Sequence, residues 1–310
     1  MKKLTIVSVL SLGVILSACS GNGGEETLSS VKSGKKIEDI HGMAISDDST
    51  TYVATHEGLF STQDIGDTWN KVGTFEADLM GFHLKSDGTM ITSGHPGAKT
   101  DLPNPMGFLT SKDKGYNWEA VEFVGKIDFH LFTSSQANPD IIYGINQMGT
   151  GKYGAGLYTS TDGGKKWEKI EPTGMPEDLH QVYSLMVMPH DDSKLLAGTE
   201  NGVLISEDGG KSFSPYDNSR LITAMNVMPN GTDIIGYSIS NDGAGVMISK
   251  DHGQTWSNMG LDLGEDAASV ISVNPKNANH IAVTTFGTSM HVSEDGGQTW
   301  EQIITSGTLK

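Results

Sequence analysis

"SEDGGQTW" at Ser293–Trp300 is a short, acidic and glycine-rich stretch that ends in an aromatic residue. Its pattern is a hydroxyl residue, an aspartate two positions on, a glycine four positions on and an aromatic ring seven positions on. All five tryptophans of the chain fall at the last position of such a stretch, so the pattern is a repeat. The other copies are "TQDIGDTW" (Thr62–Trp69), "SKDKGYNW" (Ser111–Trp118), "STDGGKKW" (Ser160–Trp167), "SEDGGKSF" (Ser206–Phe213) and "SKDHGQTW" (Ser249–Trp256).

The spacing of the repeat predicts the architecture, because copies 43 to 49 residues apart are typical of propeller blades. The motif resembles the Asp-box, or BNR, repeat of sialidases, sortilin-type receptors and related β-propellers, including those named glycosyl hydrolase-like. The resemblance covers nearly the whole mature chain at the level of fold. The repeated residues are Asp64, Asp113, Asp162, Asp208, Asp251 and Asp295, with Trp69, Trp118, Trp167, Phe213, Trp256 and Trp300.

Each residue type in the box suits a tight connection between two strands. The aspartate can accept hydrogen bonds from backbone N–H groups two or three residues on, and the glycine can adopt positive φ where the chain reverses. The aromatic ring can fold back onto the strands that the turn joins. We therefore interpret the six boxes as scaffolding and not as catalytic or calcium-binding carboxylates.

The segments around each box predict an all-β, six-bladed β-propeller of four-stranded antiparallel blades. Blade four, for example, has apolar runs at 182–189, 194–199, 202–206 and 213–216 around its box. The first strand is expected to begin near Ile40 and the last to end near Ile304. No spare strand is left for exchange between the ends, so the ring should close by packing the first blade on the sixth, as one domain over residues 37–310.

The N-terminus predicts export and anchoring. Lys2 and Lys3 precede an apolar run that is too short to span a bilayer, and "LSAC" ends at Cys19, the only cysteine. This resembles a bacterial lipoprotein signal, which implies cleavage after residue 18 and lipidation of Cys19. Residues 19–36 then form the lipidated cysteine and a flexible tether. We expect a lipid-anchored, extracytoplasmic protein at the cell membrane, on the surface of a Gram-positive cell.

The charge limits the partners. Thirty-eight acidic against 21 basic residues give a net charge of −17, which disfavours binding to nucleic acid. The only arginine is Arg220. Sialidases of this fold resemble one another in holding the substrate carboxylate with three arginines, so sialidase activity is not expected.

Acidic residues in the loops between blades are expected to surround one mouth of the central channel. A pair of carboxylates there would suit a glycoside hydrolase, whereas a solvated acidic rim is the simpler interpretation. No catalytic pair can be identified, so the chain is not assigned as an enzyme. The weak catalytic candidates are Asp78, Glu177, Glu200 and Asp266.

Two insertions, at 94–107 and 146–156, are expected to form one wall of a cleft on the same face. Their polar and aromatic residues, with two from the loop before blade four, suit sugar hydroxyls or a peptide. "GTGKYG" at Gly149–Gly154 is not followed by a helix, so it is not a phosphate site. The predicted ligand-binding residues are His95, Asp101, Asn146, Gln147, Tyr153, Asp178 and His180.

Ten histidines and 14 methionines raise the question of copper or heme, most of all at "IHGM" (Ile40–Met43). No spaced histidine motif is present and methionine commonly fills apolar gaps, so neither a metal nor a cofactor is expected. Two functions remain. The first is a lipoprotein propeller that binds a protein or glycan through its loops, and the alternative is a hydrolase of neutral glycosides.

Overall fold

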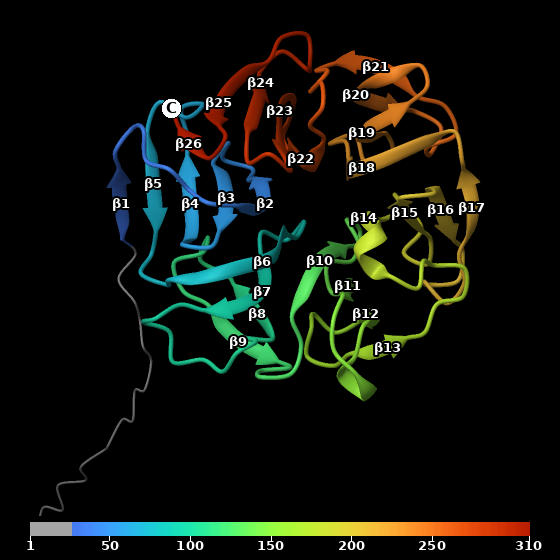
Figure 1. Ribbon diagram of the computed structural model, residues 1–310, viewed down its shortest axis with the longest axis horizontal. Helices are drawn as coiled ribbons and strands as arrows, with labels where there is room; N and C mark the ends of the chain where they lie inside the picture. The colour runs from blue at the N-terminus through green and yellow to red at the C-terminus, as the bar shows by residue number, and fades with distance from the viewer. Residues whose placement is uncertain (1–26) are drawn as a thin grey trace, which may run out of the picture.

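The computed structural model describes residues 27–310 as an all-β ring of six antiparallel sheets (Figure 1). The predicted six-bladed β-propeller is confirmed. Among the described residues, no helix is long and apolar enough to cross a bilayer.

Within each blade, consecutive strands pair in chain order. From the channel outward, blade 1 has β2 (Ile40–Ile45), β3 (Thr51–Thr55), β4 (Gly58–Thr62) and β5 (Trp69–Val72), and blade 2 has β6 (Ala77–Leu84), β7 (Met90–Pro96), β8 (Phe108–Ser111) and β9 (Glu119–Glu122). In the same order, blade 3 has β10 (Phe129–Ser134), β11 (Ile142–Asn146), β12 (Gly156–Ser160) and β13 (Glu168–Ile170), and blade 4 has β14 (Val182–Val187), β15 (Leu195–Thr199), β16 (Gly202–Ser206) and β17 (Ser214–Asp217). Blade 5 has β18 (Arg220–Val227), β19 (Ile234–Ser240), β20 (Gly243–Ser249) and β21 (Ser257–Gly260), and blade 6 has β22 (Ala268–Asn274), β23 (Asn277–Thr285), β24 (Met290–Ser293) and β25 (Glu301–Thr305).

The first and last blades each have a fifth strand, which the sequence analysis did not predict. β1 (Leu28–Val31) pairs with β5 at the outer edge of blade 1, and β26 (Thr308–Leu309) pairs with β25. The expectation of a flexible tether up to residue 36 is therefore wrong for 28–31, because the outer edge of β5 offers unpaired backbone groups to an extra strand. The predicted signal peptide and Cys19 lie outside the described residues.

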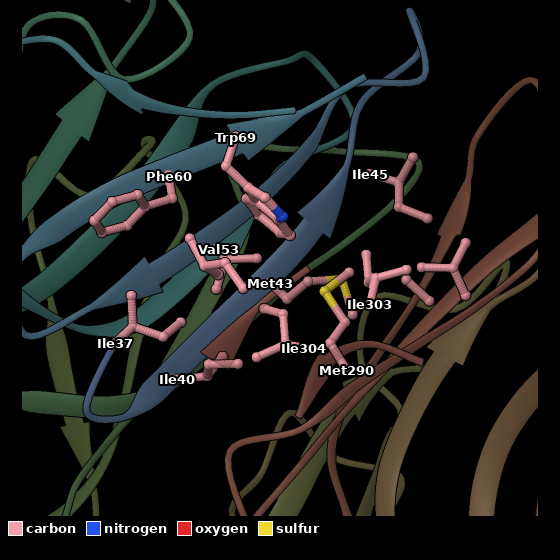
Figure 2. Packing of buried hydrophobic residues seen from close by; sticks show 13 residues of the cluster. Ile37, Ile40, Met43, Ile45, Val53, Phe60, Trp69, Met290, Ile303 and Ile304 are labelled. Atoms are coloured by element: carbon pink, nitrogen blue, oxygen red, sulfur yellow. The ribbon is translucent and has the colours of Figure 1, made fainter. Parts of the chain in front are cut away.

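The ring closes between blades 1 and 6 without exchange of a strand between their sheets among the described residues, as predicted. Three backbone hydrogen bonds join the segment before β2 to the chain end: from Ile37 N to Gly307 O (2.8 Å), from Leu309 N to Lys35 O (2.9 Å) and from Gly34 N to Leu309 O (2.9 Å). Apolar side chains of both blades bury one another here (Figure 2).

The middle strands of the blades are buried along their whole length because both faces of a blade pack on neighbouring blades. Every residue of β3, β4, β8, β11 and β15 is buried, whereas β17 and β21 at the outer edge are partly or fully exposed. This two-sided burial explains why the middle strands are runs of apolar and small residues without polar alternation.

The boxes connect the third and fourth strands of each blade. In every box the aspartate accepts from the N–H four residues on and the hydroxyl residue accepts from the glycine N–H, whereas among the described residues the indole hydrogen bond forms only at Trp167, Trp256 and Trp300. In the fifth box, Asp251 Oδ1 accepts from Thr255 N (2.8 Å), while Ser249 Oγ accepts from Gly253 N (2.7 Å). Trp256 Nε1 donates to Gly253 O (3.0 Å). The predicted donor three residues after the aspartate is found in the fourth box, where Lys211 N donates to Asp208 Oδ1 (3.0 Å). In all six boxes the N–H four residues on also donates to the aspartate, which the sequence analysis did not predict.

The box glycine also fixes how neighbouring blades pack. Gly164 has a φ of +90°, and a Cβ there would lie 2.1 Å from the ring of Phe108 in blade 2. A Cβ on Gly115 would lie 2.3 Å from Leu59, and one on Gly210 would lie 2.7 Å from Leu157, each in the preceding blade. The glycine thus serves both the turn and the contact between blades.

Candidate functional site at the channel mouth

The two faces of the ring carry different connections. The boxes lie on one face, which we call the box face. The connections between blades and between the second and third strands lie on the other, which we call the loop face. A central channel of about 850 Å³ runs between them and is lined by the innermost strands, from His41 and Tyr183 near the loop face to Asp47 and Lys276 near the box face.

All six innermost strands contain a β-bulge near their loop-face end. In blade 1, Ile40 pairs with Thr55 and Gly42 with Ala54, which leaves His41 as the extra residue. His130 and Tyr183 are the extra residues of blades 3 and 4. Bulges redirect side chains next to binding sites, and here they bring these three side chains to the channel wall.

The first histidine cluster, Asp39, His41, His56 and Asp78, spans blades 1 and 2. His41 Nε2 lies 3.4 Å from His56 Nε2 and 3.2 Å from Asp78 Oδ1. His56 Nε2 lies 3.1 Å from Asp39 Oδ2, and His56 Nδ1 lies 3.0 Å from Asp78 Oδ2. The His41 and His56 rings meet edge to face, with centroids 4.5 Å apart.

In this cluster, burial and the neighbouring charges shift the pKa values of His56 and Asp78 in opposite directions. Burial lowers the pKa of His56, but the Asp78 and Asp39 carboxylates outweigh burial and raise the pKa above its ordinary value. Burial raises the pKa of Asp78, but His41 and His56 outweigh it, so the pKa of this carboxyl is lowered. Asp78 is therefore ionised at neutral pH, which does not suit a catalytic acid.

The second histidine cluster, His95, Asn104, Asp128 and His130, joins blades 2 and 3. Oδ2 of Asp128 lies 2.9 Å from His130 Nε2 and 3.2 Å from His95 Nε2, and His95 Nδ1 lies 2.7 Å from Asn104 Oδ1. Asp128 is 6% exposed and its Oδ1 is buried without a hydrogen-bond partner. Since His95 lies opposite Asp78 in the pairing of β6 with β7, the two clusters are neighbours.

An aromatic pair lies at the mouth on the side of blades 4 and 6. The ring of Phe286, on the turn after β23, is 6.4 Å from the ring of Tyr183 at an angle of 74°, and Phe286 is 57% exposed. Asp266 Oδ1 accepts from Gly287 N (3.1 Å) and Ala267 N (2.8 Å). The carboxylate proposed as catalytic thus holds the turn that carries Phe286.

The remaining catalytic candidates lie apart from Asp78. Glu177 and Glu200 are exposed and belong to blade 4, two blades from Asp78. Asp178 and His180 pair with each other at the rim, with Nδ1 of the histidine 2.8 Å from Oδ1 of the aspartate. Asp178 also caps the short helix η2 (Leu179–Gln181).

The predicted ligand residues in the two insertions have different environments. Asn146 is buried and its Nδ2 donates to the carbonyls of Tyr153 (3.0 Å) and Gly154 (3.1 Å), so its side chain shapes the loop around helix η1 (Gly151–Tyr153). Gln147 Nε2 donates to Leu179 O (3.3 Å). Tyr153 lies under the ammonium groups of Lys152 and Lys126, and Asp101 is exposed.

Arg220 cannot serve as a free binding group for a carboxylate ligand in this arrangement. Its Nε donates to Asp217 Oδ2 at 2.6 Å, and both side chains are mostly buried.

Sequence reasoning found His95 and Asp78 but gave no role to the residues that surround them. The histidines of the first cluster are 15 residues apart, and only the pairing of β2 with β3 brings them together. A usable signal was the recurrence of a polar or aromatic residue at the second position of first strands. His41 was raised only within "IHGM", as a possible metal ligand that was then not expected, and the residues missed are His56, Asp128, His130, Tyr183 and Phe286.

Comparison with known proteins supports the architecture. The family model "BNR/Asp-box repeat" matches residues 247–258, which cover the end of β20, the fifth box and the first residues of β21. This match covers one of the six boxes, and the described residues form a six-bladed β-propeller. No curated protein matches its sequence.

Three solved structures are similar to this Asp-box propeller. The GH74 enzyme of Niastella koreensis has a TM-score of 0.61 at 19% identity, covering 91% of this chain and 47% of that one. The GH74 xyloglucanase of Xanthomonas campestris has a TM-score of 0.54 at 13% identity, covering 90% and 47%. A chain of the Mitotic Checkpoint Complex has 0.51 at 11%, covering 97% and 87%. The propeller spans about half the length of the GH74 enzymes, and these similarities concern the fold alone.

Proposed function

We infer that the protein is a binding propeller that takes a glycan at the channel mouth of the loop face. The observation that carries this proposal is the exposed Phe286 ring, which is held against Tyr183 on a turn fixed by Asp266. Binding sites for small ligands combine apolar and aromatic walls with a few polar groups. Here an exposed ring offers a flat face to sugar C–H groups, and the histidine clusters offer hydrogen bonds to hydroxyls.

A protein partner is the second kind of ligand, and the exposed surface favours it less. The core of a stable protein interface is a continuous apolar patch. Among the described residues the exposed large hydrophobic side chains are Leu28, Met148 and Phe286, which belong to blades 1, 3 and 6. Leu28 lies on the outer edge strand β1 and Met148 on the loop of blade 3, so they form no continuous patch with Phe286, and a compact ligand at the mouth suits Phe286 better.

Glycoside hydrolysis is less well supported than binding. Its two carboxyl groups must lie about 5–10 Å apart, and the acid needs a raised pKa. The pKa of Asp78 is lowered, Asp266 accepts backbone hydrogen bonds, and Glu177 and Glu200 stand two blades from Asp78. The similarity to GH74 enzymes concerns the fold and does not change this balance.

The cell surface is the proposed location. The apolar run before "LSAC" and the single Cys19 support a lipid anchor outside the cytoplasm. A surface protein of this kind meets cell-wall polysaccharide and extracellular glycans. Labelling with a palmitate analogue should depend on Cys19, and Cys19→Ser should release the protein from membranes.

The test is glycan binding by the full chain and two variants, using a glycan array and purified cell-wall polysaccharide. Phe286→Ala should weaken binding about tenfold or more, because aromatic anchors dominate such contacts. Met148→Ala is the matched control, since Met148 is 52% exposed in the loop of blade 3. Equal binding by wild type and Phe286→Ala contradicts the proposed site.

The same samples test the alternative function. A reducing-sugar assay should show no products with the wild type. Product formation that is lost in Asp78→Asn or Glu177→Gln would establish the hydrolase instead.

A further inference from the structure

The first histidine cluster has the spacing of a metal site. In a tetrahedral zinc centre with bonds of about 2.1 Å, neighbouring ligand atoms are about 3.4 Å apart. Two contacts match this spacing: His41 Nε2 to His56 Nε2 (3.4 Å) and His56 Nε2 to Asp39 Oδ2 (3.1 Å). The ligand atoms of Asp39, His41 and His56 all lie within 4.8 Å of one another.

A second observation points to a missing partner. Oδ1 of Asp78 is buried and has no hydrogen-bond partner, although it lies 3.2 Å from His41 Nε2. A buried carboxylate oxygen without a donor is costly unless a cation binds it. The negative charge of this carboxylate lies beside His41 and favours a cation in the cluster.

The outer contacts of the cluster have the pattern seen behind metal-bound imidazoles. Oδ2 of Asp78 lies 3.0 Å from Nδ1 of His56. A carboxylate in that position fixes the imidazole and leaves Nε2 for the ion. Thr288 Oγ1 of blade 6 donates to Asp39 Oδ1 at 3.5 Å and orients the other carboxylate.

We propose that Asp39, His41 and His56 bind a divalent first-row transition metal ion, of which Zn²⁺ is the best match, with Asp78 as the carboxylate behind the two histidines. Two imidazole nitrogens and one carboxylate oxygen suit zinc, whereas Ca²⁺ and Mg²⁺ take oxygen ligands. His56 is 37% and Asp39 is 56% exposed, so the ion can exchange with solvent. The ion would link blades 1 and 2 beside the closure of the ring.

The experiment is a titration of the chelator-treated full chain with ZnCl₂, followed by calorimetry. The chain carries Cys19→Ser so that the single thiol cannot bind the metal. We expect one Zn²⁺ per chain, a rise in Tm with Zn²⁺ but not with Mg²⁺, and a visible Co²⁺ spectrum typical of tetrahedral coordination.

His41→Gln and His56→Gln should each weaken Zn²⁺ binding at least tenfold, and Asp78→Asn should weaken it about tenfold or more. His180→Gln is the matched control, because His180 also contacts an aspartate at the rim but has no second histidine beside it. His56 is partly exposed, so its variant should fold with an unchanged Tm in EDTA. No binding by the wild type, or the same affinity in His56→Gln and His180→Gln, overturns the proposal.

Discussion

The box face and the loop face use aspartate in opposite ways. On the box face each aspartate accepts from a backbone N–H four residues on and from neighbouring hydroxyls, as Asp251 and Asp295 do. On the loop face, Asp78 and Asp128 contact histidines of neighbouring strands, and each keeps one buried oxygen without a hydrogen-bond partner. The repeated carboxylates build the fold, whereas those that differ between blades remain available for a ligand.

The largest effect should come from adding a methyl group to a box glycine. Gly164→Ala forces a Cβ to within 2.1 Å of Phe108 at a φ of +90° and should reduce the free energy of unfolding by about 3–4 kcal/mol. Urea denaturation measures it. Gly88→Ala is the matched control, because Gly88 has a φ of +83° but nothing within 4 Å, and it should cost about 1 kcal/mol. Equal losses would show that the glycine does not set the packing between blades.

Acid should destabilise the box face. Hydrogen bonds from the hydroxyl and then the N–H of the residue four positions on lower the pKa of Asp208, Asp251 and Asp295 from 3.8 to about 2. Since the pKa is lower in the folded state, this stabilisation is complete above the unfolded value and is lost as the pH falls from 3.8 towards 2. Urea midpoints measured through that range should fall. Asp251→Asn should make the fall shallower, and an unchanged pH profile in this variant would contradict the assignment.

The smallest effect on stability should come from the aromatic residue at the mouth. Phe286 is 57% exposed, so Phe286→Ala should change the free energy of unfolding by no more than about 0.5 kcal/mol. Thermal and urea unfolding measure it. A larger loss would make Phe286 part of the scaffold and remove the difference between the two faces.

The sequence predicted the fold well because six local motifs repeat it. Each box carries its own turn chemistry, so the blade number, the strand order and the start of β2 at Ile40 followed directly. β1 was missed because "LSSV" has no apolar alternation and its pairing with β5 joins residues about forty positions apart.

The site was predicted only in part. His95 and Asp78 were named because their loops are acidic or long, but His41 and His56 meet only through strand pairing, and Tyr183 meets Phe286 only across the ring. The bulges that direct His41 and His130 leave no mark in a hydrophobic pattern. These contacts depend on long-range geometry, which the spacing of a single sequence does not contain.

The most direct measurement is the affinity of one glycan ligand for three proteins: wild type, Phe286→Ala on the loop face and Asp251→Asn on the box face. If the loop face binds the glycan and the box face only stabilises the fold, Phe286→Ala should lose affinity for the glycan about tenfold. Asp251→Asn should keep its affinity at temperatures where both variants are folded. Loss of affinity in Asp251→Asn with retention in Phe286→Ala would contradict this division of roles.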